Sequence, residues 1–433
     1  TESAEARHLL DRQVDGLMRI ADLRGDSACF PKYEFDGKSY VNDPAGKDAP
    51  IWYGGRLILP LVEYWQISRR EDVKTFLERL VRHCTASSSF IKPDGEVERG
   101  EGWWGHLHGT MDMVTGIAEF GRLAGRPDLV AWAKRVYDWI GRTHTTRYGW
   151  VADVSGGRIC ESCGIASRFR LGLALYRAGV ADPFGEIDRH LRNQLLENQF
   201  VDVSFMASQQ SHQPRTDRQV YSGLDRMIRG TFQCWGTAND LIGNDDIEGC
   251  GAGGGVQGLK LAWDAQSEWR TTNEGDELRV HLLFNRALRG KPQPPFTSAA
   301  PVAAQLWSEL PYAGRVLVEA RQDINRLALR LPDGSDLRHV GLRRSLHRGT
   351  IPAALEGQYA VVSKVASGEV IEILFPLQLC ETVERAAGKD YLVKWKGSSV
   401  FSLSPAGQRV PLYSDRDTAL SSSAPMSQPR YPW

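Results

Sequence analysis

The sequence predicts a mainly helical fold, an α/α toroid, followed by a β-sandwich. Apolar residues recur at steps of three and four over residues 1–265 and at steps of two afterwards. The chain has 433 residues, more than the ~250–300 at which one hydrophobic core usually stops growing. We therefore expect a toroid domain over 1–265, a sandwich domain over 266–413 and a Ser- and Pro-rich extended tail over 414–433.

The helical part consists of amphipathic segments joined by short turns. In the clearest of them, Pro127 and Asp128 favour a helix start, and Leu129, Trp132 and Ile140 fall on one face. Similar stripes occupy 57–65, 76–80, 114–123, 165–173, 187–195 and 256–263. Repeated helical hairpins of this kind favour a toroid over a four-helix bundle.

The second part has the period of a strand. Leu327, Leu329 and Leu331 alternate with Ala328 and Arg330, so the leucines share one face. Further apolar runs, separated by Gly, Asp and Ser turns, occupy 278–284, 316–318, 359–365, 370–375, 391–395 and 400–403. Strands that follow helices in this way indicate a separate β domain.

Composition excludes several classes of partner. Lys+Arg and Asp+Glu both number 53, so the basic excess that drives nucleic-acid binding is missing. No apolar run approaches the ~18–20 residues of a membrane span. The odd number of cysteines, seven, is not a disulfide framework, and free thiols favour the cytoplasm. Because the first residue is Thr1 and not Met, removal of a signal peptide would also allow a secreted or periplasmic protein.

Two cysteine-containing segments are candidates for chemistry. Glu161 and Cys163 lie two residues apart in a Cys-Glu-Ser-Cys run, and a metal could take both where the backbone turns. Cys250 lies in a seven-residue stretch, 249–255, of which five residues are glycine. That stretch lacks the Gly-Lys-Ser/Thr ending of a phosphate-binding loop, but its glycines allow close backbone approach around Cys250. Each segment alone also fits a purely structural role.

A third candidate segment combines aromatic and polar side chains. His106 and His108 follow Trp104, and Asp112 comes one helical turn later. The histidines could bind a metal, recognise sugar hydroxyls or have no role. Aromatic rings stack on the apolar faces of sugars. We therefore name Trp104, Trp235, His106, His108 and Asp112 as candidate substrate-binding residues.

Taken together, these segments resemble glycoside hydrolase family 127, the β-L-arabinofuranosidases. The resemblance rests on the order and spacing of landmarks along most of the chain. They are Trp-Tyr-Gly-Gly-Arg at 52–56, Gly-Trp-Val-Ala-Asp at 149–153, Cys-Glu-Ser-Cys at 160–163, Cys250 with 258–264, and the runs at 192–199, 281–286 and 310–316.

The resemblance implies an (α/α)6 barrel followed by a β-sandwich, and a retaining hydrolase that releases a terminal sugar from an oligo- or polysaccharide. In such a mechanism a zinc-bound cysteine thiolate attacks the anomeric carbon. Cys250 corresponds to that nucleophile, Glu161 and Cys163 to metal ligands beside it, and Asp153 lies near the acid/base position. The resemblance thus assigns catalysis to Cys250, Asp153 and Glu161 and zinc binding to Glu161, Cys163 and Cys250.

The sequence also departs from the family pattern. The family has two adjacent cysteines where this chain has Cys250 and Gly251. A water, Cys160, Cys234 or a histidine could supply the fourth ligand. Alternatively, the register shifts by one and Cys250 is only a ligand, or no zinc binds. Because Asp112 stands where the family has a histidine, the resemblance leaves the identity of the substrate sugar open.

Two other functions are compatible with the sequence. A polysaccharide lyase on the same toroid would use His106, His108 or Tyr148 as base and leave an unsaturated, ultraviolet-absorbing product. A non-catalytic relative would bind glycans or a partner protein without turnover. We expect an oligo- or polysaccharide substrate, no nucleic acid and no membrane, and we leave a homodimer open.

Overall fold

The computed structural model describes residues 3–30, 33–35, 40–42, 55–87, 90–97, 106–205, 223–243, 250–291, 301–347, 349–414 and 416. The chain forms two compact units. Unit 1 comprises residues 1–145 and 151–183, and unit 2 comprises residues 146–150 and 184–433. The predicted tail over 414–433 lies almost entirely outside the described residues, and Trp104 lies outside them as well.

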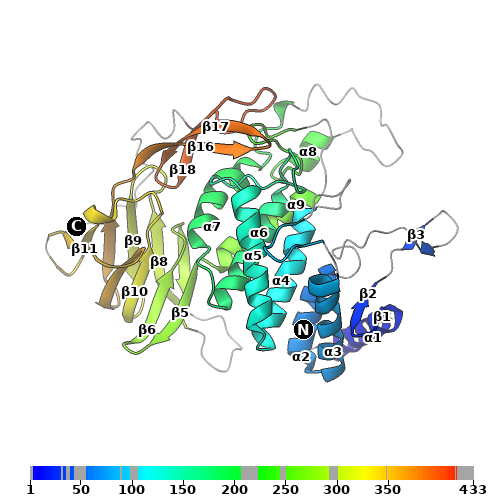
Figure 1. Cartoon of the computed structure of the whole chain (residues 1–433). Coiled ribbons are helices and arrows are strands. Elements are labelled where there is room, and N and C mark those ends of the chain that lie inside the picture. Colours follow the sequence, from blue (N-terminus) through cyan, green and yellow to red (C-terminus); the bar gives the residue numbers. More distant parts are fainter. Residues whose placement is uncertain are drawn as a thin grey trace. The chain divides into compact units, whose positions relative to one another are not determined.

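Unit 1 is mainly helical (Figure 1). Its helices are α1 (Ala4–Ile20), α2 (Ile58–Ser68), α3 (Glu71–Arg82), α4 (Leu107–Leu123), α5 (Pro127–Thr143) and α6 (Ser162–Arg177). Two short hairpins accompany them, β1 (Asp22–Arg24) with β2 (Ser27–Cys29) and β3 (Tyr33–Phe35) with β4 (Tyr40–Asn42).

Helix α5 shows why these segments are helical. Pro127 stands in its first turn and Asp128 adds a negative charge at the positive end of the helix dipole. The predicted stripe, including Leu129, Trp132 and Ile140, is buried. Burial of such side chains contributes about 1.5–3 kcal/mol each, which outweighs differences in helix propensity and fixes the orientation of α5.

Unit 2 contains α7 (Phe184–His190), the short α8 (Leu224–Ile228) and α9 (Cys250–Asp264). Helix α9 was predicted over 256–263 with an apolar stripe, but Val256 and Trp263 are largely exposed. Its buried face consists mostly of glycines instead. A Cβ atom at Gly255 would lie 2.0 Å from the ring of Phe232, so the absence of side chains allows this helix to pack directly against the 232–234 segment.

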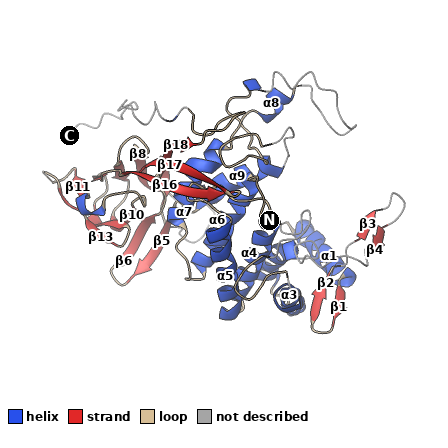
Figure 2. Cartoon of the chain, turned by 45° about the horizontal axis from the view of Figure 1, so that its top comes forward, coloured by secondary structure: helices blue, strands red, loops and turns tan. Residues whose placement is uncertain are grey.

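The strands of unit 2 form three sheets, which Figure 2 shows in red. One sheet has the order β13-β14-β10-β6-β5, a second β12-β11-β15-β9-β8-β7 and a third β16-β17-β18. The strands are β5 (Ser267–Thr272), β6 (Gly275–Val280), β7 (Arg286–Arg289), β8 (Val302–Ser308), β9 (Arg315–Ala320), β10 (Ile324–Arg330), β11 (Gly341–Arg344), β12 (Ile351–Pro352), β13 (Ala354–Glu356), β14 (Tyr359–Val365), β15 (Val370–Leu374), β16 (Leu379–Ala386), β17 (Lys389–Lys396) and β18 (Ser399–Ser404).

The first two sheets share one hydrophobic core. Leu327 and Leu329 from β10 meet Val316 and Val318 from β9 in the same buried cluster. Two sheets packed over one core make a sandwich. The predicted fold class, a helical N-terminal region followed by a β-rich region, is therefore confirmed. The change from α9 to β5 falls at the predicted boundary, residue 265, although α7 to α9 belong to unit 2, and the domain division stays a prediction.

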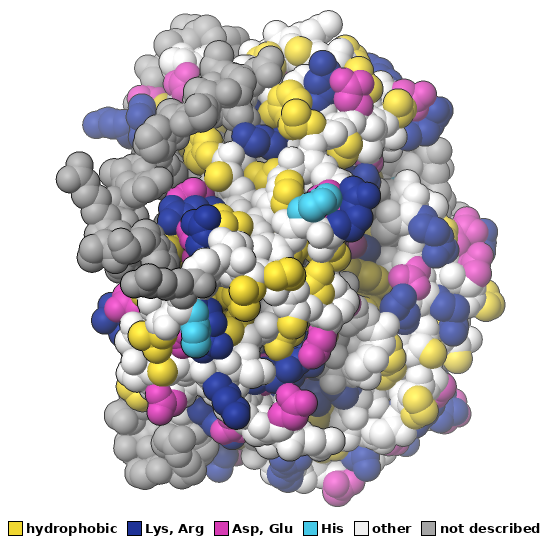
Figure 3. Space-filling model, turned by 90° about the vertical axis from the view of Figure 1, so that its left-hand side faces the viewer, with side chains coloured by type: hydrophobic (Ala, Val, Ile, Leu, Met, Phe, Trp, Pro, Cys, Tyr) yellow, Lys and Arg dark blue, Asp and Glu magenta, His cyan; other side chains and the backbone are white. Residues whose placement is uncertain are grey.

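Among the described residues, no helix combines the length and apolar character needed to cross a membrane. Basic, acidic and hydrophobic side chains are interspersed on the face shown in Figure 3. This mixture agrees with the balanced charge of the whole chain.

Candidate active site and metal ligands

Unit 1 brings Glu161 and Cys163 together at the start of α6. Glu161 is the N-cap residue and has extended backbone angles, so the backbone at Glu161 is not helical. The Cys163 Sγ atom lies 3.4 Å from Glu161 Oε2. Both residues are buried. A buried carboxylate is costly unless it is hydrogen-bonded, paired or bound to a cation, so this pair marks a functional candidate.

His106 holds the Glu161 carboxylate. Its Nδ1 atom accepts the Gly109 backbone N–H at 3.3 Å, and its Nε2 atom lies 3.1 Å from Glu161 Oε2. Since Nδ1 accepts, Nε2 carries the proton and donates it to the carboxylate. Partners of this kind orient metal ligands in proteins. His106 is buried, and its predicted role in substrate binding stays a prediction.

His108 and Asp112 belong to a polar network beside His106. The His108 and His106 rings meet edge-on with centroids 5.5 Å apart. His108 Nδ1 lies 2.7 Å from Ser167 Oγ, and Ser167 donates to Asp112 at 2.9 Å. Burial lowers the pKa of His108. Arg56 and Arg170 also contact Asp112. Arg56 Nη2 lies 3.3 Å from Asp112 Oδ2, and Arg170 Nη1 lies 2.8 Å from Asp112 Oδ1.

Asp153 is a buried carboxyl group in the same unit. Burial raises its pKa to about 6, with a smaller contribution from the nearby charge of Glu161, while a backbone hydrogen bond opposes the shift. Its Oδ1 atom is buried with no hydrogen-bond partner among the described residues. A carboxyl group with a pKa near neutrality can both give and take a proton at working pH, which is the behaviour an acid/base residue needs.

Unit 2 brings Cys234 and Cys250 together. Their Sγ atoms lie 3.0 Å apart. Cys234 is buried, whereas Cys250 is exposed at the first position of α9. A Cβ atom at Gly251 would lie 2.5 Å from the Gln233 carbonyl oxygen and 2.8 Å from the Cys234 nitrogen. Only glycine therefore fits at position 251, and the glycine allows Cys234 to approach Cys250.

Two further candidates lie in unit 2. Trp235 is half-buried, and its indole N–H is buried without a hydrogen-bond partner in the described part of the chain. Tyr148, a candidate lyase base, is fully buried and donates its hydroxyl to the Ala238 carbonyl at 3.0 Å. That hydrogen bond occupies the proton that a catalytic tyrosine would have to exchange.

Two pairs of potential metal ligands therefore lie in the described part of the chain, namely Glu161 with Cys163 in unit 1 and Cys234 with Cys250 in unit 2. Sequence reasoning named three of them and left Cys234 as one of several options for the fourth. It assigned no role to Ser167 or Arg170, because polar residues within a helix carry no motif. The sequence carried no signal for Cys234, because its approach to Cys250 at Gly251 arises only in the folded chain.

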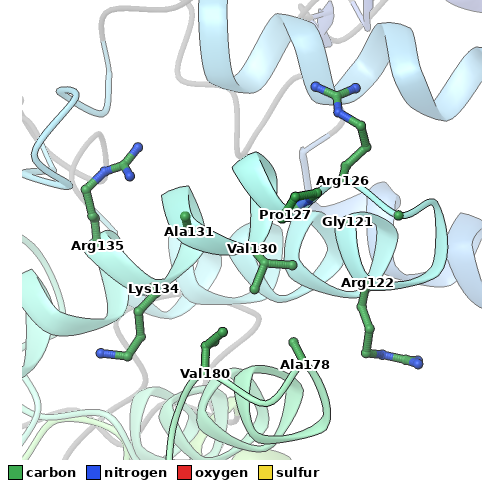
Figure 4. Close-up of a pocket in the computed structure, with 11 residues that line it drawn as sticks. Gly121, Arg122, Arg126, Pro127, Val130, Ala131, Lys134, Arg135, Ala178 and Val180 are labelled. Atoms are coloured by element: carbon green, nitrogen blue, oxygen red, sulfur yellow. The ribbon is translucent and has the colours of Figure 1, made fainter.

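A groove elsewhere in unit 1 contains none of these residues (Figure 4). It has a volume of about 570 Å³, and basic side chains surround Val130. Three of them already form ion pairs, namely Arg122 with Glu119, Arg126 with Asp128 and Lys134 with Asp138. Its basic character is therefore largely neutralised.

The fold is shared with solved glycoside hydrolase structures that combine an (α/α)6 barrel with a β domain. A GH127 β-L-arabinofuranosidase from Geobacillus stearothermophilus T6 is 11% identical with a TM-score of 0.52, over 79% of this chain and 57% of that chain. The GH127 β-arabinofuranosidase BT3674 is 13% identical with a TM-score of 0.54, over 79% of this chain and 55% of that chain. A third structure, described as a glycoside hydrolase, is 12% identical with a TM-score of 0.55, over 79% of this chain and 59% of that chain.

These likenesses confirm the predicted resemblance at the level of the fold. The chain spans little more than half the length of the structures it matches. A scan against protein-family models and a search of curated proteins find no match.

Proposed function

We propose that the protein is a retaining glycoside hydrolase that releases a terminal sugar from an oligo- or polysaccharide. The observations that carry this proposal are two pairs of potential zinc ligands, Glu161 with Cys163 in unit 1 and Cys234 with Cys250 in unit 2. The likeness of the fold to GH127 structures supports the same reaction class.

We further propose that the two pairs hold one zinc ion. Thiolates and a carboxylate are ligands that zinc accepts, and four of them complete its tetrahedral shell. The hydrogen bond from His106 to Glu161 fits this role, since zinc ligands are commonly oriented by such a partner. When bound, the zinc would keep the cysteine thiols deprotonated and ready to react.

Cys250 is the proposed nucleophile. Among the four donors it is exposed, whereas Glu161, Cys163 and Cys234 are buried. A nucleophile must reach the sugar, so exposure favours Cys250 over the other two cysteines. Its sulfur attacks the anomeric carbon and forms a carbon–sulfur bond as the bond to the leaving oxygen breaks.

Asp153 is the proposed acid/base. Its proton passes to the leaving oxygen in the first step, and its carboxylate then takes a proton from water as that water displaces the Cys250 sulfur. The sugar is released with its original anomeric configuration after two inversions. The raised pKa of Asp153 supports this role, because the carboxyl group must be protonated for the first step.

Hydrolysis of a panel of nitrophenyl furanosides and pyranosides tests the proposal. Wild type should hydrolyse at least one with retention, read by nuclear magnetic resonance of the first-formed anomer, and Cys250→Ser and Asp153→Asn should reduce kcat by at least about 100-fold. Substantial activity in Cys250→Ser would contradict the nucleophile assignment. Sugar binding without any turnover would indicate a non-catalytic relative.

The cytoplasmic location favoured by the free thiols stays a prediction.

A further inference from the structure

Two arginines of unit 1 converge on a single carboxylate. The Asp112 Oδ1 atom accepts hydrogen bonds from Arg170 Nη1 at 2.8 Å and from Ser167 Oγ at 2.9 Å. Its Oδ2 atom lies 3.3 Å from Arg56 Nη2. Both arginines are permanently charged, so the carboxylate neutralises one of them and an excess positive charge stays.

His108 does not change this balance. The Arg56 Nη2 atom lies 3.3 Å from His108 Nε2. Because a guanidinium can only donate, Nε2 is the acceptor and carries no proton. Nδ1 therefore bears the proton and donates it to Ser167 Oγ, 2.7 Å away. His108 is thus neutral, and the excess charge belongs to the arginines.

Exposure shows which arginine offers that charge to a ligand. The Arg170 side chain is 19% exposed and makes the shorter contact with Asp112. The Arg56 side chain is 41% exposed, and its contacts with Asp112 and His108 are both longer. Arg170 is therefore the partner that neutralises Asp112, whereas the guanidinium of Arg56 is held in place by two acceptors and faces solvent.

Arg56 also lies close to the proposed reaction centre. Its contact residue His108 packs edge-on against His106, and His106 donates to Glu161. All these residues belong to unit 1. A sugar bound beside Glu161 would therefore lie near the Arg56 guanidinium, with His106 and His108 linking the two side chains.

We propose that Arg56 binds the carboxylate of a uronic acid, so that the substrate is a glycoside with an anionic sugar at its terminus. This inference rests on the proposed function, since it concerns the sugar that the same site would hydrolyse. The planar guanidinium presents parallel N–H groups that match a carboxylate in a bidentate arrangement. In the described part of the chain, Arg56 and Arg170 share the single carboxylate of Asp112, so a neutral sugar would leave one of the two positive charges uncompensated there.

Binding tests the inference independently of turnover. Titration calorimetry compares glucuronic and galacturonic acid with glucose and galactose. One uronic acid should bind wild type at least about 10-fold more tightly than its neutral parent. Arg56→Gln should abolish that preference and Arg56→Lys should retain part of it. Arg24→Gln is the matched control, because Arg24 is also half exposed and paired with an aspartate. Equal binding of acid and parent would overturn the inference.

Hydrolysis separates this inference from the proposed function. Nitrophenyl uronides are compared with their neutral parents and with sulfated sugars of the same configuration. A kcat/KM preference for the uronide that disappears in Arg56→Gln supports both proposals. Hydrolysis of neutral or sulfated sugars in preference to uronides would overturn the carboxylate assignment and leave the glycosidase intact. Arg56-dependent binding of uronic acids without hydrolysis of any glycoside would support the binding site and contradict the proposed function.

Discussion

The Sγ atoms of Cys234 and Cys250 lie 3.0 Å apart although the two residues are 16 positions apart in the chain. Gly251 makes this approach possible, because a Cβ atom there would collide with the backbone of Gln233 and Cys234. Gly251 is therefore the residue that admits a cysteine from another segment of unit 2. That cysteine, Cys234, is the fourth member of the proposed ligand set.

Replacement of Gly251 by alanine should disrupt the Cys234–Cys250 pair. The added Cβ atom would lie 2.5 Å from a backbone oxygen, so α9 and the 232–234 segment must separate. We expect zinc affinity to fall by at least about 10-fold, since misplaced supporting groups cost that much. Competition with a chelator measures the zinc affinity of the variant and of wild type.

Gly253→Ala is the matched control for this change. Gly253 lies two residues further along α9, and nothing lies within 4 Å of a Cβ atom there. Alanine should raise the free energy of unfolding by roughly 0.5–1 kcal/mol through its better helix propensity and leave zinc affinity unchanged. Equal zinc affinity in Gly251→Ala and Gly253→Ala would show that close approach at Gly251 is irrelevant to the metal.

Cys234→Ala should weaken zinc binding beyond the ~10–100-fold loss typical of residues that only orient a ligand. The reason is that one of four donors is removed outright. Cys380→Ala is the control, because Cys380 is an exposed cysteine on β16. Zinc affinity of Cys234→Ala equal to that of Cys380→Ala would exclude Cys234 from the ligand set.

His106→Ala should reduce zinc affinity by about 10–100-fold because Glu161 loses the donor that orients it. His106→Gln should restore part of the affinity, since its amide N–H can donate to the same oxygen. The exposed His339 provides a control substitution. The orienting role would be wrong if the alanine and glutamine variants bound zinc equally well.

The raised pKa of Asp153 predicts two pH effects. In the folded protein the carboxyl group titrates near pH 6 instead of 3.8. The folded state therefore favours the protonated form, and its contribution to stability is complete below pH 3.8 and is lost as pH rises through about 6. The protonated form of Asp153, which acts as the general acid, is lost over the same pH range. We therefore expect kcat/KM to decrease above about pH 6.

Asp153→Asn separates the stability effect from the kinetic one. The variant should be more stable than wild type at pH 8, by up to about 3 kcal/mol if the whole pKa shift is expressed. The difference should shrink towards pH 4. Urea unfolding at both pH values measures it, with Asp94→Asn, an exposed turn residue, as control. A difference that does not change with pH would contradict the raised pKa.

The fold could largely be predicted because periodic burial dominates its energetics. The stripe in α5 and the alternation in β10 report directly which faces are buried. Helix α9 was harder, because glycines form its buried face and carry no hydrophobic signal. In the candidate site, Glu161 and Cys163 lie two residues apart, so they form a short motif that the sequence shows. Cys234 meets Cys250 only through tertiary packing. Such a contact has no fixed spacing that a single sequence can reveal.

Zinc content per chain is the most direct test of the central claim, that Glu161, Cys163, Cys234 and Cys250 are the ligands of one zinc ion. Protein purified without added metal is measured by mass spectrometry as wild type, Cys163→Ala and Cys250→Ala, with Cys380→Ala as control. We predict one zinc per chain in wild type and control, and its loss from both Cys163→Ala and Cys250→Ala. Absence of zinc from wild type, or its full retention in either ligand variant, would contradict the account.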